Sequence, residues 1–194
     1  MAIGMFWRDV WLRPKQMGAI APSGAELAQV MCEAVGLQDG HVIVELGAGT
    51  GALTKTIRAM APTSPLLAFE PGAEMAKHLQ EQFPDIRVST RFAQDLPDEL
   101  GPWGQTAVDR VVSGLPWTIW PVAEQDHILG NVVKCMKDDG KLVTFTYVHS
   151  QILPGARTLK TLLARHFTSV RRTRVAWRNV PPAFAWVGEG PKRG

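Results

Sequence analysis

The segment VELGAGTG at residues 44–51 constrains the fold of this chain more than any other. The β-branched run HVIVEL at residues 41–46 leads into it and predicts a short buried strand, and ALTKTIRAM at residues 52–60 predicts a helix. Glycine lets the backbone turn tightly and approach a ligand closely, because it has no Cβ atom. The sequence therefore predicts a strand, a ligand-binding turn and a helix in direct succession.

The same alternation of strand and helix patterns continues along the chain. Further buried strands are expected at LLAFE (66–70), IRVST (86–90), AVDRVVSGLPW (107–117, ending in a turn) and KLVTFTYV (141–148), with helices near 23–35, 72–82, 123–137 and 156–166. The extended runs 169–177 and 183–188 predict a closing hairpin. This order predicts an α/β fold with a mostly parallel sheet, helices on both faces and an antiparallel end, and one domain over residues 23–194.

Composition excludes several classes of protein. Hydrophobic residues make up 45% and charged residues 20%, as in folded globular proteins. No apolar stretch approaches the roughly 18 to 20 residues needed to span a bilayer, and no secretory pattern is present, so cytoplasmic residence is expected. Cys32 and Cys135 lie far apart in predicted helices, where burial as small apolar residues is favoured over a disulfide or a metal site.

The charge is distributed unevenly along the chain. Residues 1–20 carry a net charge of +2, residues 21–150 carry −7 and residues 151–194 carry +8. Cationic ends around an acidic middle indicate a polyanionic partner, either an anionic membrane surface or a nucleic acid. A basic surface that serves only solubility is the alternative.

Two carboxylates accompany the glycine turn. Glu45 lies just before the first glycine, where its charge would repel a pyrophosphate and suit a cationic or zwitterionic ligand, such as the amino acid end of S-adenosylmethionine. Glu70 ends the next strand, 19 residues after Gly51, where a carboxylate is placed to accept hydrogen bonds from ribose hydroxyls. The alternative is a tight turn with a packed glutamate.

On these residues, and on the order of elements from about residue 23 to the final hairpin, the chain resembles class I S-adenosylmethionine-dependent methyltransferases, which have a Rossmann-like fold. The resemblance implies a seven-stranded sheet, S-adenosylmethionine as methyl donor, S-adenosylhomocysteine as product, and a cofactor site formed by Glu45, Gly47, Ala48, Gly49, Gly51, Glu70, Phe92, Ala93 and Ser113. The segment RFAQDLP at residues 91–97 departs from the family's Gly-Asp-Ala pattern. Stacking of Phe92 on adenine, a contact from the Ala93 amide and a turn-capping role for Asp95 all remain open.

The segment SGLPW at residues 113–117 follows the fourth predicted strand and resembles the Asn/Asp-Pro-Pro-Tyr motif of amino-group methyltransferases. Ligands of this fold bind outside the carboxyl ends of the strands. The turn around Leu115 can aim a carbonyl at the target nitrogen, and Trp117 can attract a nitrogen that becomes cationic, by roughly 0.5 to 2 kcal/mol. The alternative is that Trp117 packs the turn.

Tyr147 and His149 end the fifth predicted strand. Residues two apart on a strand share a face, so both are expected to face one pocket, with a phosphate-binding or proton-accepting role. The alternative is that they tether the strand end to a loop.

The N-terminus carries an apolar stripe. Plotted on a helix, the stripe is continuous and consists of Ile3, Phe6, Trp7, Val10 and Trp11. Tryptophan favours the water–lipid boundary and the flanking basic residues favour anionic headgroups, by about 1 kcal/mol each. Residues 1–22 are therefore expected to form an amphipathic membrane-docking segment, and a core-packed or dimer-forming helix is the alternative.

This helix, GAIAPS (18–23), SGLPW (113–117) and NVPPAF (179–184) together resemble the bacterial phospholipid N-methyltransferases, which methylate phosphatidylethanolamine successively to phosphatidylcholine. The resemblance implies peripheral binding to the cytoplasmic face of the membrane and a lipid site that includes Ser23, Leu115, Tyr147 and Arg178. An ornithine-type aminolipid is also open as acceptor.

Two other functions remain possible. The rRNA adenine dimethyltransferases share the fold, the late hairpin and a basic surface, but SGLPW departs from their motif and no second helical domain for gripping RNA is expected, so nucleic acid is the less expected partner. A catalytically silent binding module is disfavoured by the intact glycines and by both acids, Glu45 and Glu70.

Overall fold

The structure is a computed structural model that describes residues 24–117, 120–152 and 154–193. Its strands are β1 (Ile43–Leu46), β2 (Leu66–Phe69), β3 (Arg87–Ser89), β4 (Val108–Ser113), β5 (Met136–Tyr147), β6 (Phe167–Arg172) and β7 (Ala183–Pro191). Its helices are α2 (Ala25–Ala34), α3 (Ala52–Met60), α4 (Ala73–Gln82), α5 (Leu96–Trp103), α6 (Val122–Cys135) and α7 (Pro154–His166), with 3-10 turns η1 (Ala93–Asp95) and η3 (Val148–Ile152). The predicted docking residues Ile3, Phe6, Trp7, Val10 and Trp11, and Ser23, lie outside the described residues.

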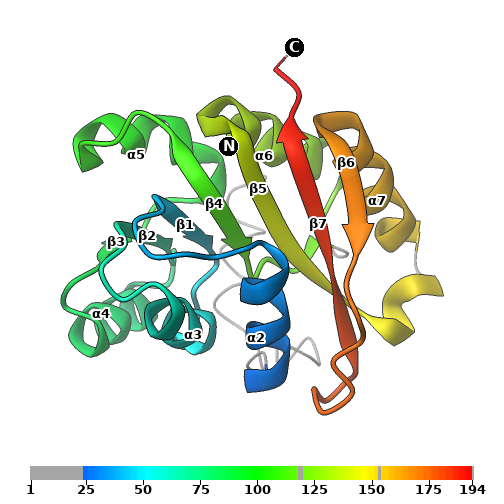
Figure 1. Cartoon of the computed structure of the whole chain (residues 1–194), viewed down its shortest axis with the longest axis horizontal. Coiled ribbons are helices and arrows are strands. Elements are labelled where there is room, and N and C mark those ends of the chain that lie inside the picture. Colours follow the sequence, from blue (N-terminus) through cyan, green and yellow to red (C-terminus); the bar gives the residue numbers. More distant parts are fainter. Residues whose placement is uncertain (1–23, 118–119, 153, 194) are drawn as a thin grey trace.

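The strands form one seven-stranded sheet in the order β3-β2-β1-β4-β5-β7-β6 (Figure 1). Strands β1 to β5 pair in parallel, whereas β7 is antiparallel to both β5 and β6. The predicted mostly parallel sheet with an antiparallel end is confirmed. The strand order reverses between β1 and β4, so a crevice for ligands opens where these two strands end. We call the side of the molecule where the parallel strands end the carboxyl edge.

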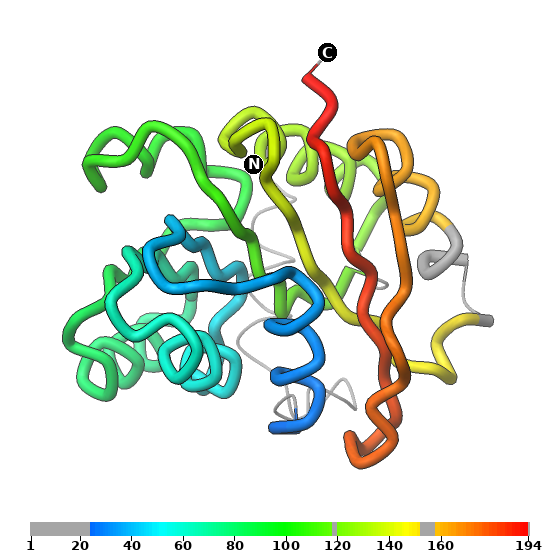
Figure 2. The backbone as a smooth tube through the Cα atoms, viewed as in Figure 1, coloured from blue at the N-terminus to red at the C-terminus, as the bar shows by residue number. Residues whose placement is uncertain are grey.

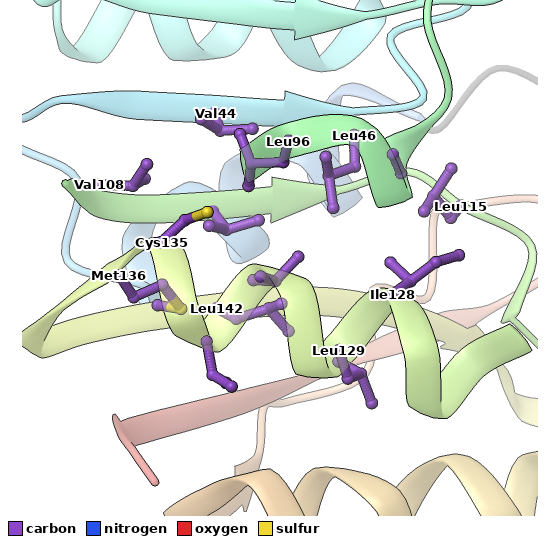
Figure 3. Packing of buried hydrophobic residues seen from close by; sticks show 14 of the residues in the cluster. Val44, Leu46, Leu96, Val108, Leu115, Ile128, Leu129, Cys135, Met136 and Leu142 are labelled. Atoms are coloured by element: carbon purple, nitrogen blue, oxygen red, sulfur yellow. The ribbon is translucent and has the colours of Figure 1, made fainter. Parts of the chain in front are cut away.

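Helices cover both faces of the sheet (Figure 1). Helices α2, α3 and α4 pack on one face through buried side chains such as Leu27, Ile57 and Leu79. Helices α5, α6 and α7 pack on the other, where Ile128 and Leu129 of α6 meet apolar side chains of β1, β4 and β5 (Figure 3). Because the central strands are buried on both faces, they read as nearly continuous apolar runs in the sequence.

The two cysteines lie on opposite faces of the sheet, Cys32 on α2 and Cys135 on α6, and both are buried and free. Burial raises the pKa of the Cys32 thiol to about 12 and that of Cys135 to about 11. Both thiols therefore stay protonated and serve as small apolar core residues, as the sequence predicts.

Strand β5 begins at Met136, earlier than the predicted start at residue 141. Val108 of β4 pairs with Met136 but Arg110 pairs with Lys141, so the polar residues 137–140 bulge out of the ladder. The bulge is anchored by an ion pair of 2.8 Å between Lys137 and Asp109. Asp138, Asp139 and Gly140, which come after the helix predicted near 123–137 and before the predicted strand, are thus part of the strand.

Helix α5 is absent from the sequence prediction because Pro97, Gly101 and Pro102 read as helix breakers. Pro97 lies in the first turn, where a missing N–H group breaks no helical hydrogen bond. Buried Leu96 and Leu100 dock the helix against α6, so packing overrides the local propensity.

The predicted hairpin has a longer connection than expected. Strand β6 ends at Arg172 and β7 begins at Ala183, so residues 173–182 form a loop at the carboxyl edge, beside the start of α2 (Figure 2). The N-cap of α2 is Gly24, and the Glu26 carboxylate binds this loop rather than its own helix terminus.

The packing of α6 yields a stability prediction. Ile128→Ala removes a fully buried side chain and should lower the free energy of unfolding by about 2–5 kcal/mol in a denaturant titration. Val122→Ala on the same helix is the matched control, because Val122 is 51% exposed, and it should change that free energy by less than about 0.5 kcal/mol. Equal effects of the two substitutions would contradict this account of the core.

Candidate active site

The glycine turn between β1 and α3 is fixed to the end of β2. The amides of Gly47 and Ala48 both donate to the Phe69 carbonyl, at 3.0 and 3.1 Å. Gly49 has a positive φ of +54°, and no atom lies within 4 Å of the place where its Cβ would be. The turn is therefore held from behind and leaves open space at Gly49, where a ligand can approach the backbone.

Glu70 connects the glycine turn to the start of α4. Its carboxylate is fully buried and accepts hydrogen bonds from the Gly49 and Gly72 amides, each at 2.8 Å and each through a separate oxygen. Burial raises the pKa of Glu70, and the two amide bonds oppose that shift. Because each carboxylate oxygen has a second lone pair, Glu70 can still accept hydrogen bonds from ligand hydroxyls.

Glu45 is a buried carboxylate with a hydrogen-bond partner on only one of its two oxygens. One oxygen accepts a 2.6 Å hydrogen bond from the Thr54 hydroxyl, and the other has no partner. Burial is the main cause that raises the pKa of Glu45 to about 7; the hydrogen bonds from Thr54 oppose this shift, and the charge of Glu70 adds a smaller increase. A buried, partly unsatisfied carboxylate is stabilised by a cation, so this corner of the site fits the ammonium group of S-adenosylmethionine.

A pocket opens beside the glycine turn at the carboxyl edge. It is small and partly open to solvent, and it is lined by Gly47, Phe69, Pro71, Phe92, Ala93, Gln94, Leu115 and Trp120. The lining is mostly apolar and aromatic, as suits a planar base. The structure thus brings together the sequence-predicted Gly47, Phe92, Ala93 and Leu115. It adds four residues that the sequence analysis missed: Phe69, Pro71, Gln94 and Trp120.

Asp95 caps the turn that carries Phe92. Its carboxylate accepts a 3.1 Å hydrogen bond from the Phe92 amide and pairs with Arg91 at 3.6 Å. Of the roles left open by the sequence, turn capping is therefore the one that the geometry supports for Asp95. Phe92 and Ala93 remain the pocket-lining residues of this segment.

The turn after β4 packs directly against the glycine turn. The Gly114 amide donates to the Leu46 carbonyl at 2.8 Å. A Cβ at Gly114 would lie 2.7 Å from the Gly47 carbonyl oxygen, closer than real Cβ contacts come. Only glycine fits there, and the SGLPW and GAGTG motifs are consequently neighbours in space.

Ser113 and Trp117 stabilise this turn from within. Ser113 is fully buried, and its hydroxyl accepts hydrogen bonds from the Trp117 indole at 3.0 Å and the Leu115 amide at 3.3 Å. Trp117 is only 1% exposed and belongs to the core. This geometry favours the packing role for Trp117 over cation–π contact with an acceptor.

Trp120 takes the position expected of Trp117 at the pocket. The two rings lie 5.9 Å apart, but Trp120, not Trp117, lines the pocket wall. The sequence offers a signal, because Trp120 follows Trp117 by three residues. Local spacing does not tell which of these two side chains faces the core.

Tyr147 and His149 come together as predicted, with stacked rings 5.6 Å apart. Tyr147 ends β5 and meets Phe145 edge to face at 5.3 Å on the α2 side of the sheet. Neither residue belongs to the described lining of the pocket, although both lie at the same carboxyl edge. Burial raises the pKa of Tyr147, so its phenol keeps its proton at neutral pH and is suited to donate a hydrogen bond.

Arg178 is exposed in the loop 173–182, away from the described pocket lining. Its backbone amide donates to Glu26 at 2.8 Å. The structure therefore does not bring Arg178 next to the glycine turn. Arg178 nevertheless lies on the same side of the molecule as the site.

The strand order and the carboxylate-flanked glycine turn define a class I methyltransferase. Residues 44–144 match the protein family described as "Methyltransferase domain", which is over half of the chain, and the protein belongs to that family. The enzyme is therefore an S-adenosylmethionine-dependent methyltransferase, and its product is S-adenosylhomocysteine.

Sequence relatives differ in the acceptor that their names give. The ornithine lipid N-methyltransferase of Singulisphaera acidiphila is 29% identical over 180 residues, which cover 91% of this chain and 90% of that protein. The ribosomal RNA small subunit methyltransferase A of Maridesulfovibrio salexigens is 29% identical over 120 residues, which cover 57% of this chain and 43% of that protein.

Solved structures share the fold. An S-adenosylmethionine-dependent O-methyltransferase from Thermotoga maritima superposes with a TM-score of 0.67 at 13% identity, covering 95% of this chain and 72% of its own. A precorrin-6y C5,15-methyltransferase from Geobacter metallireducens has a TM-score of 0.65 at 15% identity, and the superposition covers 91% of this chain and 94% of that protein. At such identities the likeness shows the fold alone.

Glu45→Gln should weaken S-adenosylmethionine binding at pH 8 by at least about tenfold in calorimetry, because the amide carries no charge to meet the ammonium group. The same change should stabilise the ligand-free protein. The folded-state pKa of Glu45, about 7, lies above its ordinary value of 4.5, so the folded protein binds more protons between these values and wild-type stability falls as pH rises through that window.

The variant lacks this loss, and its melting temperature should therefore exceed that of the wild type at pH 8 and approach it near pH 4.5. The gain at pH 8 should be roughly 3 kcal/mol at most. Glu33→Gln on the exposed face of α2 is the control and should change neither quantity. Unchanged cofactor affinity in Glu45→Gln would refute the ammonium role.

The two tryptophans yield a contrasting pair of variants. Trp117→Phe keeps a ring in the core and loses the hydrogen bond to Ser113, so it should lower stability by about 1–2 kcal/mol with methyl transfer within about twofold of wild type. Trp120→Ala removes a pocket wall and should weaken cofactor binding about tenfold. A large loss of turnover in Trp117→Phe with unchanged stability would restore a direct role for Trp117.

Proposed function

We propose that this enzyme methylates the amino headgroup of a membrane lipid, converting phosphatidylethanolamine and then its mono- and dimethyl derivatives towards phosphatidylcholine. The observation that carries the proposal is the alignment with a lipid N-methyltransferase over 91% of this chain and 90% of that relative. That relative is named for ornithine lipid, so the shared acceptor is an amine on a lipid headgroup, and an ornithine-type lipid is the alternative within this class.

In this proposal the donor and acceptor occupy the two neighbouring turns. Glu45 holds the ammonium group of the donor, Glu70 accepts its ribose hydroxyls, and Phe92 and Ala93 contact its base. When bound, S-adenosylmethionine supplies a methyl group already activated by the sulfonium charge. The turn at Leu115 orients the acceptor nitrogen beside the donor site, and such orientation supplies much of the acceleration.

The acceptor amine must be neutral before it attacks. An ethanolamine headgroup is mostly protonated near neutral pH, so a proton has to leave. The raised pKa of Tyr147 makes its phenol a poor proton acceptor, and we assign it a hydrogen bond to the lipid phosphate instead. His149, which is exposed beside Tyr147, and water are the remaining proton acceptors, and Arg178 is a second phosphate partner.

Charge supports a membrane partner. Residues 151–194 carry a net charge of +8, which favours an anionic lipid surface. No helix in the described part of the chain is long and apolar enough to cross a bilayer. We propose that the enzyme binds the cytoplasmic face of the membrane peripherally and that residues 1–22 dock there.

Methylation of rRNA adenine is the second candidate. It is favoured by the ribosomal RNA methyltransferase relative, although that alignment covers 57% of this chain and 43% of the relative. The basic C-terminal part of the chain suits RNA as well as lipid.

A labelling experiment separates these candidates. The full chain is incubated with methyl-labelled S-adenosylmethionine and, in parallel, with phosphatidylethanolamine vesicles, ornithine-lipid vesicles or protein-free ribosomal RNA. Label should appear in the lipid fraction and run as mono-, di- and trimethylated phosphatidylethanolamine. Glu45→Gln, with weakened donor binding, is the control and should label little. Label confined to RNA would overturn the proposal.

A further inference from the structure

Exposed large apolar side chains gather on one side of the molecule. Among the described residues they are Val122 (51% exposed), Val148 (37%), Trp177 (70%) and Val180 (79%). Val122 begins α6 just after the β4 turn, Val148 follows β5, and the other two lie in the loop after β6. Because β4, β5 and β6 run in the same direction, all four lie at the carboxyl edge, where the pocket opens.

The loop 173–182 is a firmly held structure. Ala176 bridges to Ala183, with a 2.7 Å hydrogen bond from its amide. The buried Asn179 side chain accepts from the Gly24 amide at 2.7 Å and donates to the Pro181 carbonyl at 2.6 Å. Inward Ala176 and Asn179 thus fix the loop while Trp177 and Val180 point outward.

Large exposed apolar side chains held in this way mark an interaction surface. The exposed Trp177 and Val180 side chains add no hydrophobic stabilisation to the fold, since neither is among the buried core residues. Their position on a fixed loop beside the active site indicates a partner that the site itself has to reach.

Two arginines flank Trp177 in the loop 173–182. Arg174 pairs with Glu26 at 3.1 Å, and the second oxygen of Glu26 accepts from the Arg178 amide. The Arg178 guanidinium is exposed and makes no salt bridge within the described part of the chain. A tryptophan and a valine flanked by arginine match the boundary between lipid tails and anionic headgroups.

We propose that the loop 173–182 is a second membrane-docking element, which inserts Trp177 and Val180 into an anionic lipid surface and turns the pocket towards the bilayer. The inference rests on the proposed lipid acceptor. Lipid is favoured over RNA because three of the four exposed apolar side chains are valines, which have no ring to stack on a base.

The loop also lies where the chain enters the described structure. Gly24, the partner of Asn179, lies two positions after the end of the predicted docking segment, residues 1–22. Figures 1 and 2 show the start of α2 and the loop together at the lower side of the view. Both docking elements would therefore approach the membrane from the carboxyl edge.

A fluorescent probe tests insertion directly. Cys32 and Cys135 are buried with raised thiol pKa values, so Val180→Cys can be labelled selectively with a polarity-sensitive fluorophore. Phosphatidylcholine vesicles with about a third phosphatidylglycerol should shift its emission to the blue. Lys134→Cys, exposed near the far end of α6, is the matched control and should not shift. An unshifted probe at position 180, or a shift with ribosomal RNA but not with vesicles, would overturn the inference.

Binding and turnover give an independent measurement. Combining Trp177→Ala with Val180→Ser should weaken partition into these vesicles about tenfold, whereas Trp177→Phe should stay within about threefold of wild type. Arg178→Gln should weaken it about fivefold and the control Lys134→Gln by less than twofold.

The two proposals fail separately. The variant carrying both Trp177→Ala and Val180→Ser should methylate dispersed short-chain phosphatidylethanolamine at the wild-type rate and vesicle lipid about ten times more slowly. Vesicle binding without methylation of any lipid would overturn the proposed function and leave the docking loop in place. Methylation of vesicle lipid at the wild-type rate by this variant would overturn the docking loop alone, and loss of activity on dispersed lipid would place the loop in the active site instead.

Discussion

The contact between two backbone turns determines the geometry of this site. The turn after β4 lies so close to the glycine turn after β1 that a Cβ at Gly114 would come within 2.7 Å of the Gly47 oxygen. The contact exists because β1 and β4 are adjacent parallel strands that end at the same level, with Leu46 beside Ser113. The GAGTG and SGLPW motifs, about 65 residues apart in sequence, therefore contribute to one pocket, as the strand reversal of this fold dictates.

Around this contact the protein keeps two carboxylates out of water. Glu70 is compensated by two backbone amides, whereas one oxygen of Glu45 has no partner. Such an arrangement is unfavourable for the ligand-free protein and favourable for the complex with a cation. In the function that we propose, the stability lost by burying Glu45 is exchanged for affinity towards the cationic end of the methyl donor.

Local sequence patterns were sufficient for the sheet and for the glycine turn. The run VELGAGTG combines a β-branched strand with glycines and a helix, so all of its signals agree. Helix α5 was missed because Pro97 and Pro102 argue locally against a helix that packing against α6 stabilises. The β5 bulge was missed for a similar reason, since the Lys137–Asp109 ion pair that anchors it joins different strands.

The site was predictable to the extent that it depends on backbone. Glu45, Glu70 and the β4 turn lie together because strand ends align in any parallel sheet. The distinction between Trp117 and Trp120 depends on which indole reaches Ser113, and no period in the sequence encodes that. The loop 173–182 likewise takes its shape from Gly24 and Glu26, at the other end of the described chain.

The contact between Glu26 and the loop 173–182 requires residues from both ends of the described chain. Arg178 and Glu26 are separated by 152 positions, so the contact between α2 and the loop 173–182 cannot form until nearly the entire chain is present. Contacts between such distant residues form late, because the intervening chain must first be ordered. A nascent or truncated chain would therefore lack a finished carboxyl edge, and the membrane affinity that we propose for the loop 173–182 would arise only with the native state.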